Sequence, residues 1–265
     1  MLAAPSIPSG IKLMRIAIVE DDTVMIRLIH SALQSGFEER NISVTITSFE
    51  SGKDFIRVAS RETFDIVFLD WHLPDGTGIG LIDWMKKYLE ALPAVLMVTQ
   101  RQEERDIIEA LNAGADDFIS KPFRPKELAA RAFAAIRRRS LRTSATAQQS
   151  ELEYGQIRLN SDREVAFVAG EEVALTRQEF RLAYLLLNQL GSPLSRSYLY
   201  EYVWGRSNDP NTRTLDVHIH RVRKKLKLTA EHGWNLVSVY GYGYRLQAVN
   251  APKEDSQDSL RTGSG

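Results

Sequence analysis

The 265-residue chain contains no cysteine. Disulfide bonds, zinc–thiolate sites and thiol nucleophiles are therefore excluded, and the composition fits a reducing, cytoplasmic compartment. The chain also lacks any apolar run near the roughly 18 residues that a membrane helix needs, so we expect no membrane partner. Residues 1–13 contain Pro5, Pro8 and Gly10, which interrupt the apolar stretch that a secretory signal requires.

An excess of either charge is also missing, since 34 Lys and Arg balance 34 Asp and Glu. Overall charge therefore does not indicate a nucleic-acid partner, and only local clusters can. The length and 43% hydrophobic content suit two ordinary domains with separate cores. We expect an N-terminal extension at 1–13 with Met14 as an alternative start, a domain at 14–139, a polar linker at 140–150, a second domain at 151–249 and a disordered tail at 250–265.

The first domain alternates apolar strand-like segments with amphipathic helix-like segments. The strand-like segments are 15–19, 43–49, 65–69, 94–98 and 117–120, and the helix-like segments are 24–36, 51–61, 80–89, 103–113 and 124–139. Five such pairs predict an α/β domain with a parallel sheet covered by helices on both faces.

Polar residues stand where these strands end. Glu20 and Asp21 follow the first strand, Asp70 the third, Thr99 the fourth and Lys121 the fifth. The carboxyl ends of parallel strands share one edge of the sheet, so these side chains should meet there. Neighbouring carboxylates need a cation, and oxygen ligands suit Mg²⁺. A carboxylate can also attack phosphorus to form an aspartyl-phosphate, whose charge a metal ion and a lysine would neutralise.

Each feature taken alone has a simpler explanation. The acidic run 20–22 could be a solvated turn that caps the following helix, and Asp70 could begin a turn with Pro74 and Gly76. The joint pattern, with matching residues at four strand ends in order, favours a functional site.

Four segments resemble the receiver domain of two-component response regulators over residues 14–139. They are Val-Glu-Asp-Asp at 19–22, Phe-Leu-Asp-Trp-His-Leu-Pro-Asp-Gly at 68–76, Met-Val-Thr at 97–99 and Lys-Pro-Phe at 121–123. The resemblance implies a flavodoxin-like five-stranded parallel sheet. It also implies that a sensor histidine kinase phosphorylates Asp70.

The same resemblance implies roles for the neighbouring residues. Mg²⁺ would be held by Asp21, Asp70 and the backbone carbonyl of His72, with Glu20 helping through water. Thr99 and Phe118 would form the switch pair, and Lys121 would hold a phosphoryl oxygen.

Three positions affect how closely the family pattern applies. Gln100 stands where the family usually has a small residue, and Phe118 stands where it often has Tyr. His72 lies two residues past Asp70, where a side chain can influence hydrolysis of the phosphate. We therefore expect these residues to alter the phosphorylation kinetics or the switch itself.

The second domain carries a basic helix-like segment at 213–227. Leu215, Ile219, Val222 and Leu226 repeat at helical spacing and are expected in the core. His218, Arg221 and Lys225 line another face, with Arg223 and Lys224 beside it. Such a face suits the major groove and phosphates of DNA, although a merely solvated basic face is common.

The surroundings of this segment favour DNA. Two shorter helices precede it and a glycine-containing hairpin follows it. Leu-Thr-Arg-Gln-Glu-Phe at 175–180, Trp204 and Val-Tyr-Gly-Tyr-Gly-Tyr-Arg at 239–245 resemble the OmpR/PhoB-type effector domain, an α+β winged helix-turn-helix. The resemblance implies a recognition helix with Arg213, His218, Arg221 and Arg223, and a wing with Ser238 and Tyr240.

The resemblance also implies a homodimer when phosphorylated, with pairing residues Asp117, Glu127, Arg131 and Arg138. RNA polymerase is a further candidate partner. Two alternatives stay open: a receiver that acts as a phosphorylation-independent dimerisation module, which Gln100 would support, and an α/β phosphohydrolase. The second lacks a substrate-binding insertion, so we expect a regulator of transcription and not an enzyme.

Overall fold

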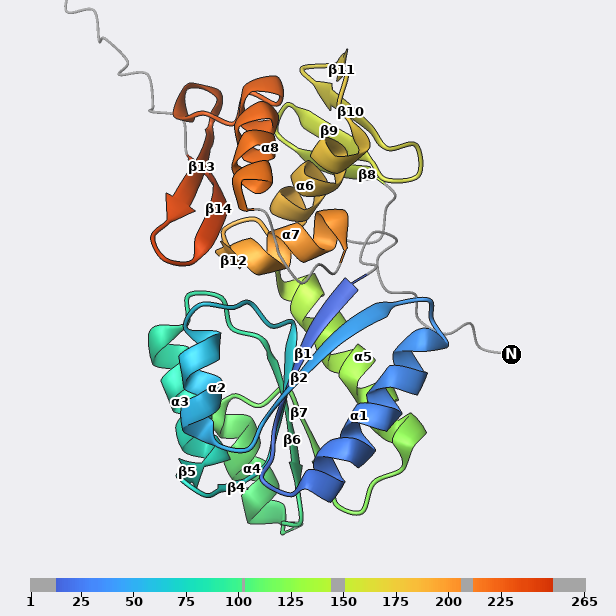
Figure 1. The fold of residues 1–265 in the computed structure, drawn as a ribbon, viewed down its shortest axis with the longest axis vertical. Coiled ribbons are helices and arrows are strands. Elements are labelled where there is room, and N and C mark those ends of the chain that lie inside the picture. Colours follow the sequence, from blue (N-terminus) through green and yellow to red (C-terminus); the bar gives the residue numbers. More distant parts are fainter. Residues whose placement is uncertain (1–12, 102, 144–150, 206–211, 250–265) are drawn as a thin grey trace, which may run out of the picture.

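The computed structural model describes residues 13–101, 103–143, 151–205 and 212–249, which form two domains in contact (Figure 1). The first domain comprises β1 (Leu13–Val19), α1 (Thr23–Glu38), β2 (Ser43–Phe49), α2 (Gly52–Ala59), β3 (Ile66–Leu69), β4 (His72–Leu73), β5 (Gly76–Thr77), α3 (Gly78–Tyr88), β6 (Ala94–Thr99), α4 (Glu104–Ala113), β7 (Asp117–Ser120) and α5 (Pro125–Thr143).

A five-stranded parallel sheet in the order β2-β1-β3-β6-β7 forms the centre of this domain. Helices α1 and α5 cover one face and α2, α3 and α4 cover the other (Figure 1). Alternate residues of β1 serve the two cores, because Ile16 and Ile18 pack with α1 and α5 whereas Ala17 and Val19 pack on the opposite side. The predicted flavodoxin-like fold is confirmed.

Short polar side chains begin the helices near the carboxyl edge of the sheet. Asp22 caps α1, Ser51 caps α2 and Thr77 caps α3. The carboxylate of Asp75 accepts the backbone N–H groups of Gly52 and Lys53 at 2.9 and 2.8 Å. The loop that follows β3 is thereby attached to the start of α2, and this fixes the backbone around the strand end.

The second domain has two small antiparallel sheets around three helices. Its elements are β8 (Glu151–Tyr154), β9 (Ile157–Asn160), β10 (Val165–Val168), β11 (Glu171–Val173), α6 (Arg177–Asn188), β12 (Leu194–Ser195), α7 (Arg196–Trp204), α8 (Thr212–Lys225), the 3-10 turn η1 (Ala230–His232), β13 (Trp234–Val239) and β14 (Gly243–Ala248). The hairpin β13–β14 is the wing. The apolar stripe predicted for α8 is buried, and the predicted winged helix-turn-helix is confirmed.

Some boundaries differ from the sequence-based expectation. Helix α5 continues to Thr143, into the segment expected to be the linker, and 144–150 lie outside the described residues. The expected extension up to residue 12 and the expected tail at 250–265 also lie outside them. Strand β8 was not predicted as a strand, because Leu152 is its single fully buried side chain and gives little periodicity.

Among the described residues, no helix combines the length and apolar character needed to cross a membrane.

Close packing of α1 on α5 generates the first prediction. A Cβ added at Gly36 would lie 2.4 Å from Cβ of Ala129, far inside van der Waals contact. Alanine favours a helix by about 1 kcal/mol over glycine. Overpacking costs about 1–3 kcal/mol, so Gly36→Ala should lower the free energy of unfolding despite its helix propensity. Urea unfolding of the full chain measures this. Gly76→Ala, where a Cβ meets open space, is the control. A more stable Gly36→Ala protein would contradict the packing described.

Candidate phosphoryl-acceptor site and nucleic-acid interface

Asp70 lies directly after β3 at the carboxyl edge of the sheet. Its backbone N–H donates to the carbonyl of Val19 at 3.0 Å, which joins the ends of β1 and β3. One carboxylate oxygen accepts the backbone N–H of Trp71 at 2.6 Å, and the other accepts Nζ of Lys121 at 2.9 Å. The same Nζ donates to Glu20 at 2.6 Å. One ammonium group therefore bridges the ends of three strands.

Three carboxylates converge beside this ammonium. Oxygen atoms of Glu20, Asp21 and Asp70 lie within 4.8 Å of one another. Burial raises the pKa of Glu20 to about 7; Lys121 opposes the shift and the charge of Asp70 adds to it. Burial by itself would lower the pKa of Lys121, but the hydrogen bonds to Glu20 and Asp70 outweigh this effect and raise that pKa above its ordinary value. A hard cation such as Mg²⁺ would relieve the remaining repulsion, and the oxygen donors fit it.

The expected switch residues surround this cluster. Thr99 is buried at the end of β6, and its hydroxyl accepts the backbone N–H of Arg101 at 3.3 Å. Phe118 is half-buried on β7 and packs with the core beneath α2, α3 and α4. The side chain of Gln100 is exposed. His72 is exposed on β4, at the rim of the cluster.

Arg101 is a neighbour of the site that the sequence did not single out. Its guanidinium lies 4.8 Å from the ring centroid of Trp71 and 3.4 Å from Nε2 of His72, and it pairs with Asp106 at 3.0 Å. Because Arg101 stands two residues past the end of β6, its position in the sequence could have indicated that it lies near the site. Arg101 adds positive charge at the rim where a phosphoryl group would enter.

The four expected pairing residues form one partly exposed network on β7 and α5. Asp117 accepts from Arg131 at 3.2 Å and from Arg138 at 3.3 Å, and Arg131 also pairs with Glu127 at 3.0 Å. These pairs lie within one chain. Ion pairs between partly exposed side chains contribute little stability.

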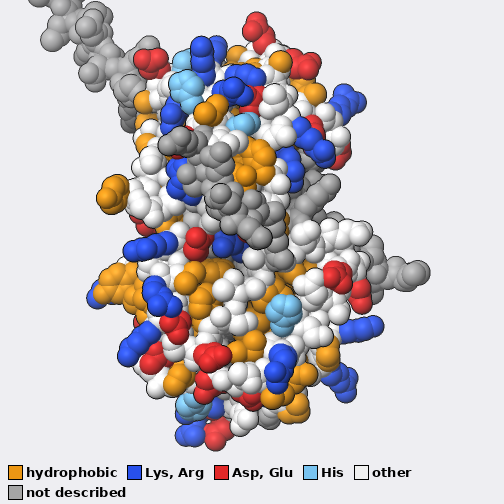
Figure 2. Space-filling model, in the orientation of Figure 1, with side chains coloured by type: hydrophobic (Ala, Val, Ile, Leu, Met, Phe, Trp, Pro, Cys, Tyr) orange, Lys and Arg blue, Asp and Glu red, His pale blue; other side chains and the backbone are white. Residues whose placement is uncertain are grey.

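The expected DNA-contacting residues lie on α8 and the wing, and Lys, Arg and His side chains gather on this domain (Figure 2). Arg221, Ser238 and Tyr240 are exposed. His218 is half-buried, donates from Nδ1 to the carbonyl of Thr214 at 2.8 Å and meets the ring of Trp204 edge-on.

Other basic side chains of α8 bind to neighbouring elements of the same domain. Arg223 donates to the carbonyl of Leu236 at 2.8 Å, which holds the wing beside the helix. Lys225, expected on the basic face, instead pairs with the buried Glu179 at 2.7 Å. Arg213 lies in the first turn of α8, and its side chain is outside the described part of the structure. His220 and Lys224 are exposed beside Arg221 and enlarge the basic surface.

Comparison with known proteins matches both halves of the chain. Residues 16–133 match the family model described as response regulator receiver domain. Residues 170–246 match the model described as transcriptional regulatory protein, C terminal.

Curated relatives cover between 71% and 89% of the chain. The transcriptional regulatory protein BasR of Escherichia coli is 35% identical over 89% of this chain and 98% of its own. The sensory transduction protein RegX3 of Mycolicibacterium smegmatis is 37% identical over 71% and 81%, and the response regulator SaeR of Staphylococcus aureus is 33% identical over 81% and 91%. The chain belongs to the OmpR/PhoB family of two-component response regulators.

The position of Lys121 in this response regulator generates the second prediction. Its ammonium group already neutralises part of the charge of Glu20 and Asp70. Lys121→Ala should therefore bind Mg²⁺ more tightly, by about tenfold or more, since unit charges a few ångströms apart interact by several kcal/mol near a protein surface. Titration followed by tryptophan fluorescence measures this, because Trp71 adjoins Asp70. The control is Lys126→Ala, which alters an exposed lysine of α5. Weaker binding in Lys121→Ala would contradict the electrostatic account.

Proposed function

We propose that this chain is a transcription regulator switched by phosphorylation of Asp70. A sensor histidine kinase supplies the phosphoryl group, and the phosphorylated chain dimerises and binds promoter DNA through α8 and the wing. The observation that carries this proposal is the single Lys121 ammonium group held between Asp70 and Glu20, with the carboxylate of Asp21 beside them. One site thus combines a carboxylate that can accept a phosphoryl group, a cation, and a second carboxylate that can bind a metal ion.

The chemistry follows from the atoms around Asp70. A carboxylate oxygen of Asp70 attacks the phosphorus, and the bond to the donor's imidazole nitrogen breaks with its electron pair leaving on that nitrogen. Mg²⁺, when bound by Glu20, Asp21, Asp70 and the carbonyl of His72, would neutralise the charge of the phosphoryl oxygens. Lys121 releases part of its contact with Asp70 and pairs with a phosphoryl oxygen.

Thr99 on β6 and Phe118 on β7 would pass the change on to the face formed by β7 and α5. The Thr99 hydroxyl moves from the Arg101 backbone to the phosphoryl group, and Phe118 turns inward into the space beside it. The pairs among Asp117, Arg131 and Arg138 then exchange with those of a second copy. Two effector domains thereby reach half-sites about one helical turn apart, and RNA polymerase is a further partner.

Several features support DNA as the ligand of the second domain. Arg221, His220 and Lys224 present positive charge from one helix, which matches the phosphates and base edges of a major groove. Tyr240 is fully exposed on the wing, where it can contact a sugar or a phosphate. We further propose a cytoplasmic location and a regulatory role without enzymatic turnover.

The third prediction tests the switch. Beryllofluoride with Mg²⁺ mimics a phosphoryl group, so it should raise the affinity of the wild-type chain for selected genomic fragments by about tenfold or more, a coupling of about 1–3 kcal/mol. Asp70→Asn should abolish this response, whereas Asp83→Asn on the exposed side of α3 should retain it. Binding to genomic fragments, followed by sequencing, measures affinity and half-site spacing together. An equal affinity of the wild type and Asp70→Asn, each with and without beryllofluoride, would favour a phosphorylation-independent dimerisation module.

A further inference from the structure

An ion pair joins the segment after β6 to the first turn of α4. Arg101 stands two residues past the end of β6, and its guanidinium pairs with the carboxylate of Asp106 at 3.0 Å. The Asp106 side chain is 6% exposed and that of Arg101 is 39% exposed, so a buried anion meets a cation at the surface. Within the described residues Asp106 has no second cationic partner, and an unpaired carboxylate at this depth would be unfavourable.

The start of α4 has no side-chain cap. The side chain of Glu103, the N-cap residue, makes no hydrogen bond to the first turn, whereas the N-cap side chains of α1, α2 and α3 each accept a backbone N–H group. A helix start without a cap depends more on contacts from outside the helix. The pair with Arg101 therefore helps to hold the first turn of α4 in place.

The guanidinium of Arg101 also lies beside the residues that surround Asp70. It lies 4.8 Å from the ring centroid of Trp71, whose backbone N–H donates to the carboxylate of Asp70 at 2.6 Å. It also lies 3.4 Å from Nε2 of His72. The backbone N–H of Arg101 donates to the Thr99 hydroxyl at 3.3 Å. The same residue therefore contacts both α4 and the surroundings of the acceptor carboxylate.

A phosphoryl group on Asp70 would compete with Asp106 for this cation. A phosphoryl group presents three acceptor oxygens and up to about two negative charges, and a guanidinium can bind such oxygens with two parallel N–H donors. The ring of Trp71 carries no charge, and His72 accepts from a guanidinium only as a neutral imidazole, so Asp106 is the competing anion.

We propose that Arg101 is a second phosphoryl-binding cation, which exchanges Asp106 for a phosphoryl oxygen and thereby releases the first turn of α4. Arg101 would act from the end of β6 and Lys121 from the end of β7, so the two cations would bind different oxygens of one group. The inference rests on the proposed phosphorylation of Asp70. Asp106 is a positioning residue, because it determines how readily Arg101 is available.

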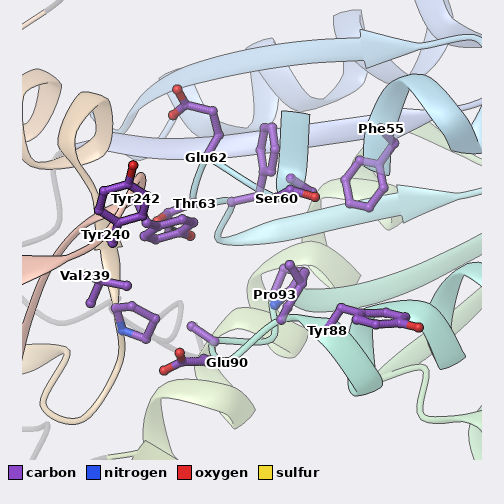
Figure 3. A pocket seen from close by; sticks show the side chains of 15 residues that line it. Phe55, Ser60, Glu62, Thr63, Tyr88, Glu90, Pro93, Val239, Tyr240 and Tyr242 are labelled. Carbon is purple, nitrogen blue, oxygen red and sulfur yellow. Dashed lines mark hydrogen bonds between the residues drawn. The ribbon is translucent and has the colours of Figure 1, made fainter. Parts of the chain in front are cut away.

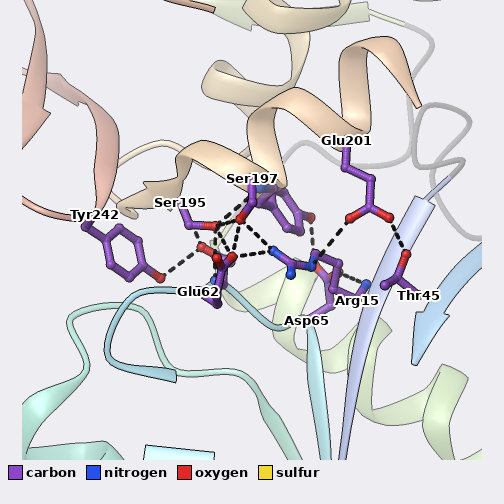
Figure 4. A network of polar contacts seen from close by, with 10 residues as sticks. Arg15, Thr45, Glu62, Asp65, Ser195, Ser197, Glu201 and Tyr242 are labelled. Carbon is purple, nitrogen blue, oxygen red and sulfur yellow. Dashed lines mark hydrogen bonds and ion pairs between the residues drawn. The ribbon is translucent and has the colours of Figure 1, made fainter. Parts of the chain in front are cut away.

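The contacts between the two domains lie at the other edge of the receiver sheet. The hydroxyls of Thr63 and Tyr242 meet there at 2.9 Å, within a polar network (Figure 4) and beside a pocket that both residues line (Figure 3). Arg101 and Asp106 instead follow the end of β6, at the edge that carries Asp70. Substitutions of this pair therefore leave the interdomain contacts in place, and the full-length chain can be used for the experiment.

The affinity for beryllofluoride at saturating Mg²⁺ tests the exchange. The midpoint of the change in tryptophan fluorescence measures this affinity, because Trp71 adjoins Asp70. Arg101→Ala should weaken binding by about tenfold, since it removes a cation that contacts the bound anion. Asp106→Asn should strengthen binding by about tenfold, since it removes the anion that competes for Arg101. If the pair were merely structural, both substitutions would change the affinity in the same direction.

The double variant distinguishes the exchange from charge repulsion alone. If Asp106 acts through Arg101, Asp106→Asn should change the affinity by less than about threefold in a chain that already carries Arg101→Ala. A gain as large as in the wild-type background would overturn the exchange. Glu104→Gln removes an exposed carboxylate from the same turn of α4, so it is the matched control and should bind as the wild type does.

The double variant also keeps the test valid if Arg101→Ala alone does not fold, because it contains no unpaired buried carboxylate. It should then bind beryllofluoride at least about tenfold more weakly than Asp106→Asn, since the two proteins differ only in the presence of Arg101. Equal affinities in these two variants would overturn the binding of the phosphoryl group by Arg101.

Hydrogen exchange tests the release of α4. The backbone N–H groups of Asp106 and Ile107 donate to the carbonyl of Glu103 at 2.9 and 3.2 Å. Beryllofluoride should increase their exchange rates by about tenfold or more in the wild type, and should change them little in Arg101→Ala, where the pair is already absent. Unchanged exchange in wild-type protein with beryllofluoride bound would overturn the release.

The binding experiment also separates this inference from the function on which it rests. A wild-type chain that does not bind beryllofluoride would overturn the proposed phosphorylation of Asp70. A wild-type chain that binds it, with Arg101→Ala binding equally well, would overturn only the role of Arg101.

Discussion

The ammonium group of Lys121 between Asp70 and Glu20 is the interaction on which the receiver's arrangement depends. It joins the ends of three strands and offsets the charge repulsion between the two carboxylates that share this confined site. Because the cation and both anions are held by strand ends, a new charge at Asp70 must change the partners of Lys121. The same edge carries Thr99 at the end of β6, beside β7, so in our proposal a change of charge at Asp70 is passed on to these two strands.

The fold and the acceptor site could be predicted from the sequence because their signals are local. Asp70 and Lys121 each follow an apolar run. Because parallel strands end at the same edge of the sheet, these two residues, 51 positions apart, are predicted to lie close together. The apolar spacing of α8 likewise predicted its buried stripe. Strand β8 was missed because a strand of four residues with one buried side chain gives no pattern that differs from a loop.

The contacts between the domains could not be predicted in this way. Arg15 and Ser197 are 182 positions apart, and no spacing or motif in the sequence indicates that their side chains meet. Lys225 was expected on the basic face of α8, but its ammonium group pairs with the buried Glu179, because a buried carboxylate requires a charged partner. Helical spacing assigns a residue to a face of a helix, whereas the partner of its side chain depends on elements distant in the sequence.

The effector domain contacts the receiver at the edge of the sheet where β1 and β3 begin. In our account, phosphorylation acts at the other edge of the sheet, where β3 ends at Asp70. The most direct test of that account is intact-mass and peptide mapping after incubation with Mg²⁺ and a small-molecule phosphodonor. We predict an adduct with the mass of one phosphoryl group on the peptide that contains Asp70, and none in Asp70→Asn. A wild-type chain without the adduct, or with an adduct that survives in Asp70→Asn, would contradict the central claim.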